Sequence, residues 1–141
     1  MALVPYTHKV QYYETDTMKI VHHSNYIRWF EEARVDMLEQ MGIGYDVMEK
    51  EGILSPVLSV RCEYKSMTRF PEQVNITVRL VRYTGVKFEI AYEIRGAEDG
   101  TLRAAGESAH CFIDGSGKPI SLRRRFPEWD KAFLSYAENG R

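Results

Sequence analysis

Asp16 and His23 lie seven residues apart in a polar segment that precedes a long helical stretch. The first backbone N–H groups of a helix lack internal partners and carry a partial positive charge. They can therefore bind the oxyanion that forms when a carbonyl group is attacked. A carboxylate beside such a helix end favours acyl transfer, because it can attack the carbonyl or activate a water molecule.

The same residues also have interpretations without chemistry. Asp16 could hydrogen-bond only within its own turn, and His22 and His23 could simply begin a helix. Adjacent histidines point in different directions on a helix, so a metal site formed by His22 and His23 together is not expected. No third ligand with metal spacing is evident. Spacing alone leaves these alternatives open, and neither a metal nor a cofactor is predicted.

The elements that would position these residues follow from the apolar pattern. Period-two alternation over residues 4–12 predicts a first strand. Apolar residues at three- and four-residue steps predict a long helix over 24–41, with Ser24 or Asn25 as its N-cap. A further helical turn is expected near 45–51, before Gly52.

A second group of strands follows the helical region. Four strands are predicted, at residues 58–64, 74–81, 86–94 and 101–113. The last changes its apolar phase near Gly106, which predicts a β-bulge. Pro127 suits the first turn of a terminal helix over 127–138. An antiparallel sheet has one apolar face to cover, so we expect it to wrap around helix 24–41 in a single domain over 1–141.

The composition is that of an ordinary globular protein. The chain has 141 residues, 44% hydrophobic and 28% charged, with a net charge of −1, so attraction to nucleic acid is not implied. No stretch approaches the ~20 apolar residues of a membrane-spanning helix. The start of the chain has no apolar signal region, so we expect a cytoplasmic protein without membrane insertion. Cys62 and Cys111 are expected to be buried free thiols.

One block of this sequence resembles a known signature. Tyr12-x-x-x-Asp16-x-x-x-x-Val21-x-His23-x-Asn25-Tyr26, followed by Phe30-Glu31-x-Ala33-Arg34, is similar to the motif of the hotdog-fold acyl-CoA thioesterases. The nearest likeness is to the 4-hydroxybenzoyl-CoA thioesterase family and to the acyl-CoA thioesterases associated with the Tol-Pal system. The resemblance covers about residues 6–115, and its specific part is the block from Asp16 to Tyr26.

The resemblance implies an α+β hotdog fold, in which a five-stranded antiparallel sheet wraps around a long central helix, with a short C-terminal helix. It implies that Asp16 is the nucleophile or general base. It assigns the backbone N–H of His23 to the thioester carbonyl, with an assisting role for the side chain. Tyr12 would line the site, and Asn25 and Tyr26 would fix the loop. One departure is that bulky residues follow the aspartate, namely Thr17-Met18-Lys19.

The resemblance also implies a homodimer or homotetramer with the site between subunits, which agrees with the need to protect exposed strand edges. Substrate contacts are then expected from Asn25, from Val57 and Ser59 on the partner's strand, and from Lys65 and Arg69 near the phosphates of coenzyme A. Other basic candidates for these phosphates are Arg82, Lys87 and residues 123–125. A solvated surface charge is the more ordinary interpretation of Lys65, Arg69, Arg82 and Lys87, and residues 123–125 could simply mark a solvated turn. The expected acyl pocket comprises Tyr45, Met48, Val57 and Leu58.

Two rival functions remain. Hotdog hydratases carry an Asp-x-Asn-Pro-x-His block, whereas Thr17-Met18-Lys19-Ile20 follows Asp16 here, which argues against dehydration chemistry. A hotdog protein that binds acyl-CoA or acyl-carrier protein without catalysis would keep the same core. Release of free thiol from acyl-CoA distinguishes a thioesterase from such a binding protein.

Overall fold

A computed structural model describes residues 2–140. Its elements, in chain order, are β1 (Tyr6–Lys9), the short 3-10 turn η1 (Tyr12–Glu14), α1 (Ser24–Gln40), α2 (Tyr45–Lys50), β2 (Val57–Tyr64), β3 (Gln73–Tyr83), β4 (Lys87–Gly96), β5 (Leu102–Cys111), α3 (Leu122–Arg125) and α4 (Pro127–Tyr136). The five strands form one sheet in the order β1-β3-β4-β5-β2, and every neighbouring pair is antiparallel. β1 and β2 are therefore its two edges.

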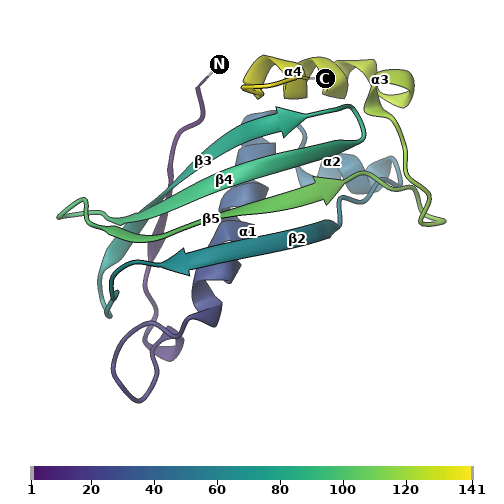
Figure 1. Cartoon of the computed structure of the whole chain (residues 1–141). Coiled ribbons are helices and arrows are strands. Elements are labelled where there is room, and N and C mark those ends of the chain that lie inside the picture. Colours follow the sequence, from purple (N-terminus) through teal and green to yellow (C-terminus); the bar gives the residue numbers. More distant parts are fainter. Residues whose placement is uncertain (1, 141) are drawn as a thin grey trace.

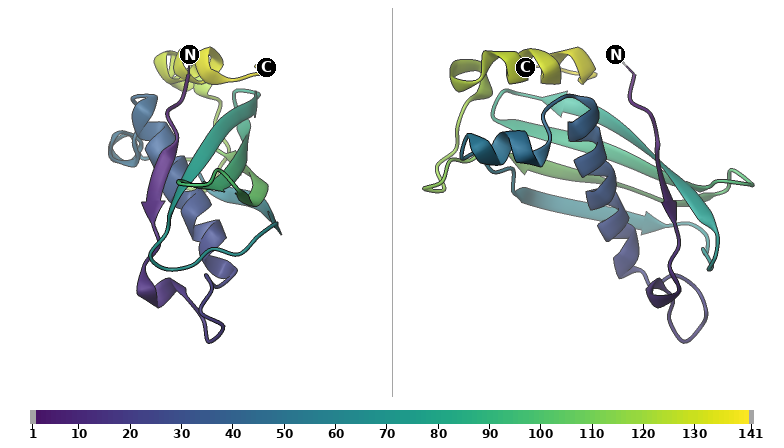
Figure 2. Two further views of the ribbon diagram at one scale, coloured as in Figure 1. Left: turned by 90° about the vertical axis from the view of Figure 1, so that its left-hand side faces the viewer. Right: turned by 180° about the vertical axis from the view of Figure 1, so that it is seen from behind.

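The long helix covers one face of this sheet. Figure 1 shows α1 running behind β3, β4, β5 and β2, and Figure 2 shows from behind that α1 and α2 share this face. The apolar side of α1 is fully buried there because its side chains recur at helical spacing. It consists of Trp29, Phe30, Ala33, Met37 and Leu38. Alternate residues of β3 and β4, including Ile76, Leu80, Ile90 and Ile94, complete the core.

A second packing layer lies across one end of the sheet, where α3 and α4 sit (Figure 1). Phe133 of α4 stacks on Tyr83 with ring centroids 4.9 Å apart and also contacts Phe88 and Phe112. The predicted terminal helix is confirmed. The preceding helix α3 was not predicted, because its four residues are too few to display a helical period.

Gly106 does not form the predicted bulge. It pairs in register with Tyr92 on β4 and with Cys62 on β2, and the register shifts of β5 lie nearer its two ends. The ring of Phe30 stacks on that of Tyr92, with centroids 4.3 Å apart and planes at 12°. A Cβ atom on Gly106 would lie 2.7 Å from the Phe30 ring and would collide with the carbonyl of Arg61. The glycine therefore makes room for the central helix.

Two further expectations needed correction. Neither Ser24 nor Asn25 caps α1 through its side chain: the helix begins after His23, and the Asn25 amide bonds to another segment. Only Cys111 of the two free thiols is buried, and Cys62 is half-buried. The predicted α+β fold, with five antiparallel strands around a long helix, is confirmed. Within residues 2–140 no helix has the length and apolarity needed to cross a bilayer.

Candidate active site

Asp16 lies in a small loop whose shape is fixed by its own backbone. The loop is closed by an antiparallel bridge between Thr15 and Val21. Asp16 N–H donates to the Ile20 carbonyl, and Lys19 N–H donates to the Asp16 carbonyl, both at 2.9 Å. Lys19 has a φ of 64°, which an L-residue rarely adopts, at the point where the loop turns back. One carboxylate oxygen of Asp16, Oδ1, accepts the Met18 N–H at 2.8 Å.

Glu14 anchors the start of this loop to the core. Its Oε1 accepts hydrogen bonds from the Gln11 N–H at 2.7 Å and from the ring of His8 at 2.9 Å. Its Oε2 accepts the indole N–H of Trp29 at 2.8 Å. Burial alone would raise the pKa of this carboxyl, but the bonds from His8, Gln11 and Trp29 outweigh it and lower the pKa. Glu14 is therefore a buried carboxylate with every oxygen engaged.

The N-terminus of α1 is tied to the same loop. The side-chain amide of Asn25 donates to the Glu14 carbonyl at 2.8 Å, and the His22 N–H donates to the same oxygen at 2.9 Å. The Ser24 N–H donates a hydrogen bond to Nδ1 of the His22 ring at 3.2 Å. Among residues 2–140, nothing accepts a hydrogen bond from the His23 N–H. A helix start with a free N–H group is thus held next to the loop that carries Asp16.

Asp16 and His23 line the same cleft, which has a volume of about 380 Å³. Tyr26, Tyr64, Lys65 and Met67 belong to its other walls. The hydroxyl group of Tyr64 donates to the His23 carbonyl at 3.1 Å, which joins the end of β2 to the start of α1. The cleft therefore contains a carboxylate, a helix N-terminus and a largely apolar wall.

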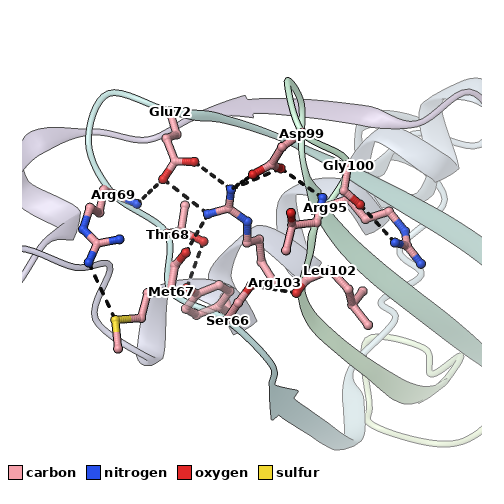
Figure 3. A network of polar contacts seen from close by, with 12 residues as sticks. Ser66, Met67, Thr68, Arg69, Glu72, Arg95, Asp99, Gly100, Leu102 and Arg103 are labelled. Carbon is pink, nitrogen blue, oxygen red and sulfur yellow. Dashed lines mark hydrogen bonds and ion pairs between the residues drawn. The ribbon is translucent and has the colours of Figure 1, made fainter.

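Thr68 ties the segment after β2 to the end of the Asp16 loop and to α1. Its carbonyl accepts the Val21 N–H at 2.8 Å, and its hydroxyl group accepts a hydrogen bond from Tyr26 at 3.1 Å. Arg103 supports the same segment, because its guanidinium donates to the Met67 carbonyl at 2.6 Å and to Glu72 at 2.8 Å (Figure 3). The buried arginine fixes the backbone that carries Lys65 and Met67.

A second, smaller pocket of about 240 Å³ lies farther along α1, beside β2. Its lining includes the apolar side chains of Ile27, Phe30, Val57 and Val60, together with Arg28, Glu31, Tyr92, Ser108 and His110. The register shift between Val57 and Ser59 turns Val57 to the same face of β2 as Val60. In one chain this second pocket and the Asp16 cleft lie at opposite ends of β2.

The predicted site residues fall into three groups. Asp16, His23 and Lys65 meet at the Asp16 cleft, and Val57 lines the second pocket. Tyr12 is 76% exposed, rests edge-on against Phe70 and is not among the residues that line the cleft. Asn25 is buried, and its amide fixes the loop. Ser59 and Arg69 line neither space.

The expected acyl pocket is assembled differently from the prediction. Met48 is fully buried in the core, and Tyr45 lies under the guanidinium of Arg34, 5.4 Å from its ring centroid. Leu58 is half-exposed on the strand edge. Of the four predicted pocket residues, only Val57 lines the second pocket.

Several residues that build the site were not predicted from the sequence. Glu14 stands two residues before Asp16, in a polar segment. Its role as a buried anchor could not be predicted, because the groups that bind it, from His8, Gln11 and Trp29, come from three different segments. Tyr64, Thr68 and Arg103 are distant in sequence from the loop that they support. The one available signal was a glutamate between the strand and the long helix, in a segment that already carried the motif.

Comparison with known proteins places this geometry in a family. The family described as the thioesterase-like superfamily matches residues 10–135. A Bacillus subtilis protein named as a candidate acyl-CoA thioesterase, YneP, is 36% identical over 126 residues, which are 89% of this chain and 91% of that protein. The acyl-CoA thioester hydrolase YbgC of Escherichia coli is 25% identical over 114 residues, 81% of this chain and 85% of that one.

The solved structures agree with the sequence comparisons. The crystal structure of a DHNA-CoA thioesterase from Staphylococcus aureus superposes with a TM-score of 0.88 at 36% identity, over 93% of this chain and 88% of that chain. A protein from Aquifex aeolicus superposes with a TM-score of 0.82 at 31% identity, over 90% of this chain and 98% of that chain. From the extent of these matches, the chain belongs to the thioesterase-like superfamily, in its acyl-CoA thioesterase family.

Proposed function

We propose that this protein hydrolyses acyl-CoA thioesters and that Asp16 is its catalytic carboxylate. The observation that carries the proposal is the shared cleft, in which the Asp16 carboxylate and the free N–H of His23 line one space. The membership of the chain in the thioesterase-like superfamily supports the reaction class. The two groups provide what hydrolysis of a thioester requires: a group that activates the attack and a donor for the oxyanion.

The reaction can follow two routes from this geometry. In the first, Asp16 removes a proton from water, the resulting hydroxide adds to the thioester carbon, and the oxyanion is stabilised by the His23 N–H. Collapse of this intermediate breaks the C–S bond, and the coenzyme A thiolate takes up the proton. In the second route, Asp16 itself attacks the carbon, and collapse of the oxyanion breaks the C–S bond, which expels the coenzyme A thiolate and leaves a mixed anhydride on Asp16. Water then cleaves the anhydride, which releases the acid, restores the Asp16 carboxylate and supplies the proton that the thiolate takes up.

The site is completed, in this proposal, by a second copy of the chain. β2 is an edge strand, and four of its apolar side chains are between 41% and 50% exposed. These are Val57, Leu58, Val60 and Tyr64. An edge of this kind invites pairing with another strand. When two copies of β2 pair antiparallel about their midpoints, the Tyr64 end of one strand meets the Val57 end of the other.

Such a dimer joins the two spaces described above. The Asp16 cleft ends at Tyr64, and the second pocket begins at Val57. Each Asp16 cleft therefore opens onto the second pocket of the partner, which suits a substrate whose thioester lies at Asp16 and whose acyl group reaches into the partner. Lys65 at the cleft, with Arg69 nearby in the chain, would meet the phosphates of coenzyme A.

The test is a panel of acyl-CoA thioesters with free thiol release as the readout. We expect turnover by the native protein and a loss of about 100-fold or more in Asp16→Asn, with the fold intact by circular dichroism. The matched control is Asp46→Asn, an exposed aspartate on α2, which should keep its activity. Saturable binding of acyl-CoA without thiol release by the native protein would instead identify a binding protein.

A further inference from the structure

Tyr64, the last residue of β2, joins the edge of the sheet to the start of α1. Its hydroxyl group donates to the carbonyl of His23, the residue whose own N–H has no acceptor among residues 2–140. Within the helix, the bond to this carbonyl is long, because the Tyr26 N–H reaches it at 3.4 Å, whereas N–H···O bonds usually measure about 2.9–3.0 Å. Tyr64, at 3.1 Å, therefore supplies the shorter of the two bonds to this carbonyl.

The Tyr64 ring is held in place although it lines an open cleft and is 48% exposed. It packs edge-on against the Tyr26 ring, with centroids 5.4 Å apart, and against the His23 ring at 6.1 Å. Burial, and then Cys62 and Tyr26, raise the pKa of its hydroxyl group. The group therefore keeps its proton at physiological pH and remains a donor to the His23 carbonyl.

Both peptide units that flank the Cα atom of His23 are held by hydrogen bonds. The unit before it, which carries the His23 N–H, is fixed by the bond from the Asn25 N–H to the His22 carbonyl at 3.0 Å. The unit after it is fixed by Tyr64. The φ of −56° and the ψ of −29° at His23 are thus defined from both sides, and the free N–H keeps one direction.

We propose that Tyr64 is a positioning residue that aligns the His23 N–H with the thioester carbonyl. This inference rests on the proposed function, in which that N–H binds the oxyanion. Tyr64 acts from β2, the edge strand along which the partner's pocket for the acyl group is proposed to lie. Its bond to residue 23 therefore fixes the oxyanion donor relative to the strand beside which the acyl group is bound. A misplacement of about 1 Å can cost on the order of 100-fold in rate, so a side chain that acts through His23 can matter for turnover.

The first measurement concerns the His23 N–H itself and needs no substrate. Relaxation of ¹⁵N nuclei gives the order parameter of this group in the native protein and in Tyr64→Phe. We expect about 0.85, the value of a rigid backbone, in the native protein and a fall toward about 0.6 in Tyr64→Phe. Tyr13→Phe, which removes the hydroxyl group of an 80% exposed tyrosine outside the lining of the cleft, is the control and should keep the native value. An unchanged order parameter in Tyr64→Phe would overturn the inference.

The second measurement separates kcat from KM, with the acyl-CoA that the native protein hydrolyses fastest. In Tyr64→Phe we expect kcat to fall by about 10-fold and KM to stay within about 2-fold, because the ring that lines the cleft remains while the donor loses its alignment. A native kcat in Tyr64→Phe would overturn the positioning role and leave hydrolysis standing. A lower order parameter in Tyr64→Phe without thiol release by the native protein would keep the tie from Tyr64 and overturn hydrolysis.

A double-mutant cycle tests whether Tyr64 acts through the N–H. His23→Ala keeps this group, and His23→Pro removes it at a φ that suits the proline ring. Tyr64→Phe should again cost about 10-fold in kcat when combined with His23→Ala, and less than about 2-fold when combined with His23→Pro, because the group that it positions is then absent. Equal costs in the two backgrounds would show that Tyr64 acts by another route. Circular dichroism checks each fold, and the first two measurements decide the question if His23→Pro does not fold.

Discussion

The indole N–H of Trp29 donates a 2.8 Å hydrogen bond to Glu14 Oε2, and this bond ties the buried face of α1 to the segment that carries Asp16. Trp29 is fully buried and Glu14 is only 4% exposed, so the bond lies inside the core. The position of Asp16 relative to the helix start thus depends on Glu14, two residues earlier, although the Glu14 side chain does not line the Asp16 cleft.

Replacing Glu14 with glutamine should therefore reduce both stability and activity. The amide group of glutamine would place a donor against donors from Gln11, His8 or Trp29, so at least one charged hydrogen bond is lost. We expect the free energy of unfolding to fall by about 2–3 kcal/mol, measured by urea denaturation, and kcat to fall as the loop loosens. Glu49→Gln, an exposed glutamate on α2, is the control and should change neither.

His23→Ala should cost less activity than Asp16→Ala. The proposed oxyanion donor at this position is the backbone N–H, which alanine retains. We expect a loss of less than about 10-fold for His23→Ala, against about 100-fold or more for Asp16→Ala, in thiol-release assays. A loss at position 23 as large as that at position 16 would mean that the imidazole ring takes part in the reaction.

Gly106→Ala should destabilise the fold, because the added methyl group meets Phe30 and the Arg61 carbonyl. We expect a loss of about 2–3 kcal/mol in the free energy of unfolding, as for other overpacked cores. Gly115→Ala is a matched control, because no atom lies within 4 Å of the Cβ position there. Equal stabilities of the two variants would show that α1 can shift away from the sheet without cost.

Arg103→Ala should loosen the wall of the Asp16 cleft that carries Lys65 and Met67. It leaves Glu72 without its buried partner and the Met67 carbonyl without its donor (Figure 3). We expect a loss of about 2 kcal/mol, below the usual cost of breaking a buried pair because Glu72 is partly exposed. Arg95→Ala, whose partner Glu93 is at the surface, should have little effect. Hydrogen exchange would report the local change at residues 65–69.

His110 should make the stability depend on pH. Burial, and then the positive charge of Arg34, lower its pKa in the folded protein to about 3, below the ordinary value of 6.5, so the unfolded chain binds the proton more readily. Its contribution is complete above pH 6.5 and is lost as the pH falls toward 3. Between pH 6.5 and 4.5 we expect a loss of about 2–3 kcal/mol from this residue. Urea denaturation should show a shallower decline over this interval in His110→Gln than in the native protein.

The sequence predicts the long helix and four of the five strands well because their apolar periods are local, whereas the first strand covers Tyr6–Lys9 and not 4–12. The predicted helix over 24–41 and the observed α1 differ by one residue, and β3 and β4 lie close to their predicted ranges. Gly106 shows the limit of this reasoning, since its apparent phase break reflects a contact with Phe30 seventy-six residues earlier. A contact at that separation leaves no periodic trace in either segment.

The candidate site was likewise predicted only in part, because some of its residues are identified by a local motif and others only by tertiary contacts. The motif identified Asp16 and His23, which the structure brings to one cleft. It could not identify Glu14 as the anchor, because three of the groups that surround this carboxylate come from separate elements. Nor could it predict that Val57 faces the second pocket, because this depends on a register shift between β2 and β5. Tertiary contacts supply this information, and residue types alone do not.

The bridge between Thr15 and Val21 closes the Asp16 loop upon itself, so that backbone bonds rather than side-chain packing hold its shape. The three residues at its tip, Thr17, Met18 and Lys19, are all exposed, and Met18 also forms part of the cleft. Substitutions at the tip can therefore alter one wall of the cleft, and with it the substrates that fit, while the backbone that carries Asp16 stays in place.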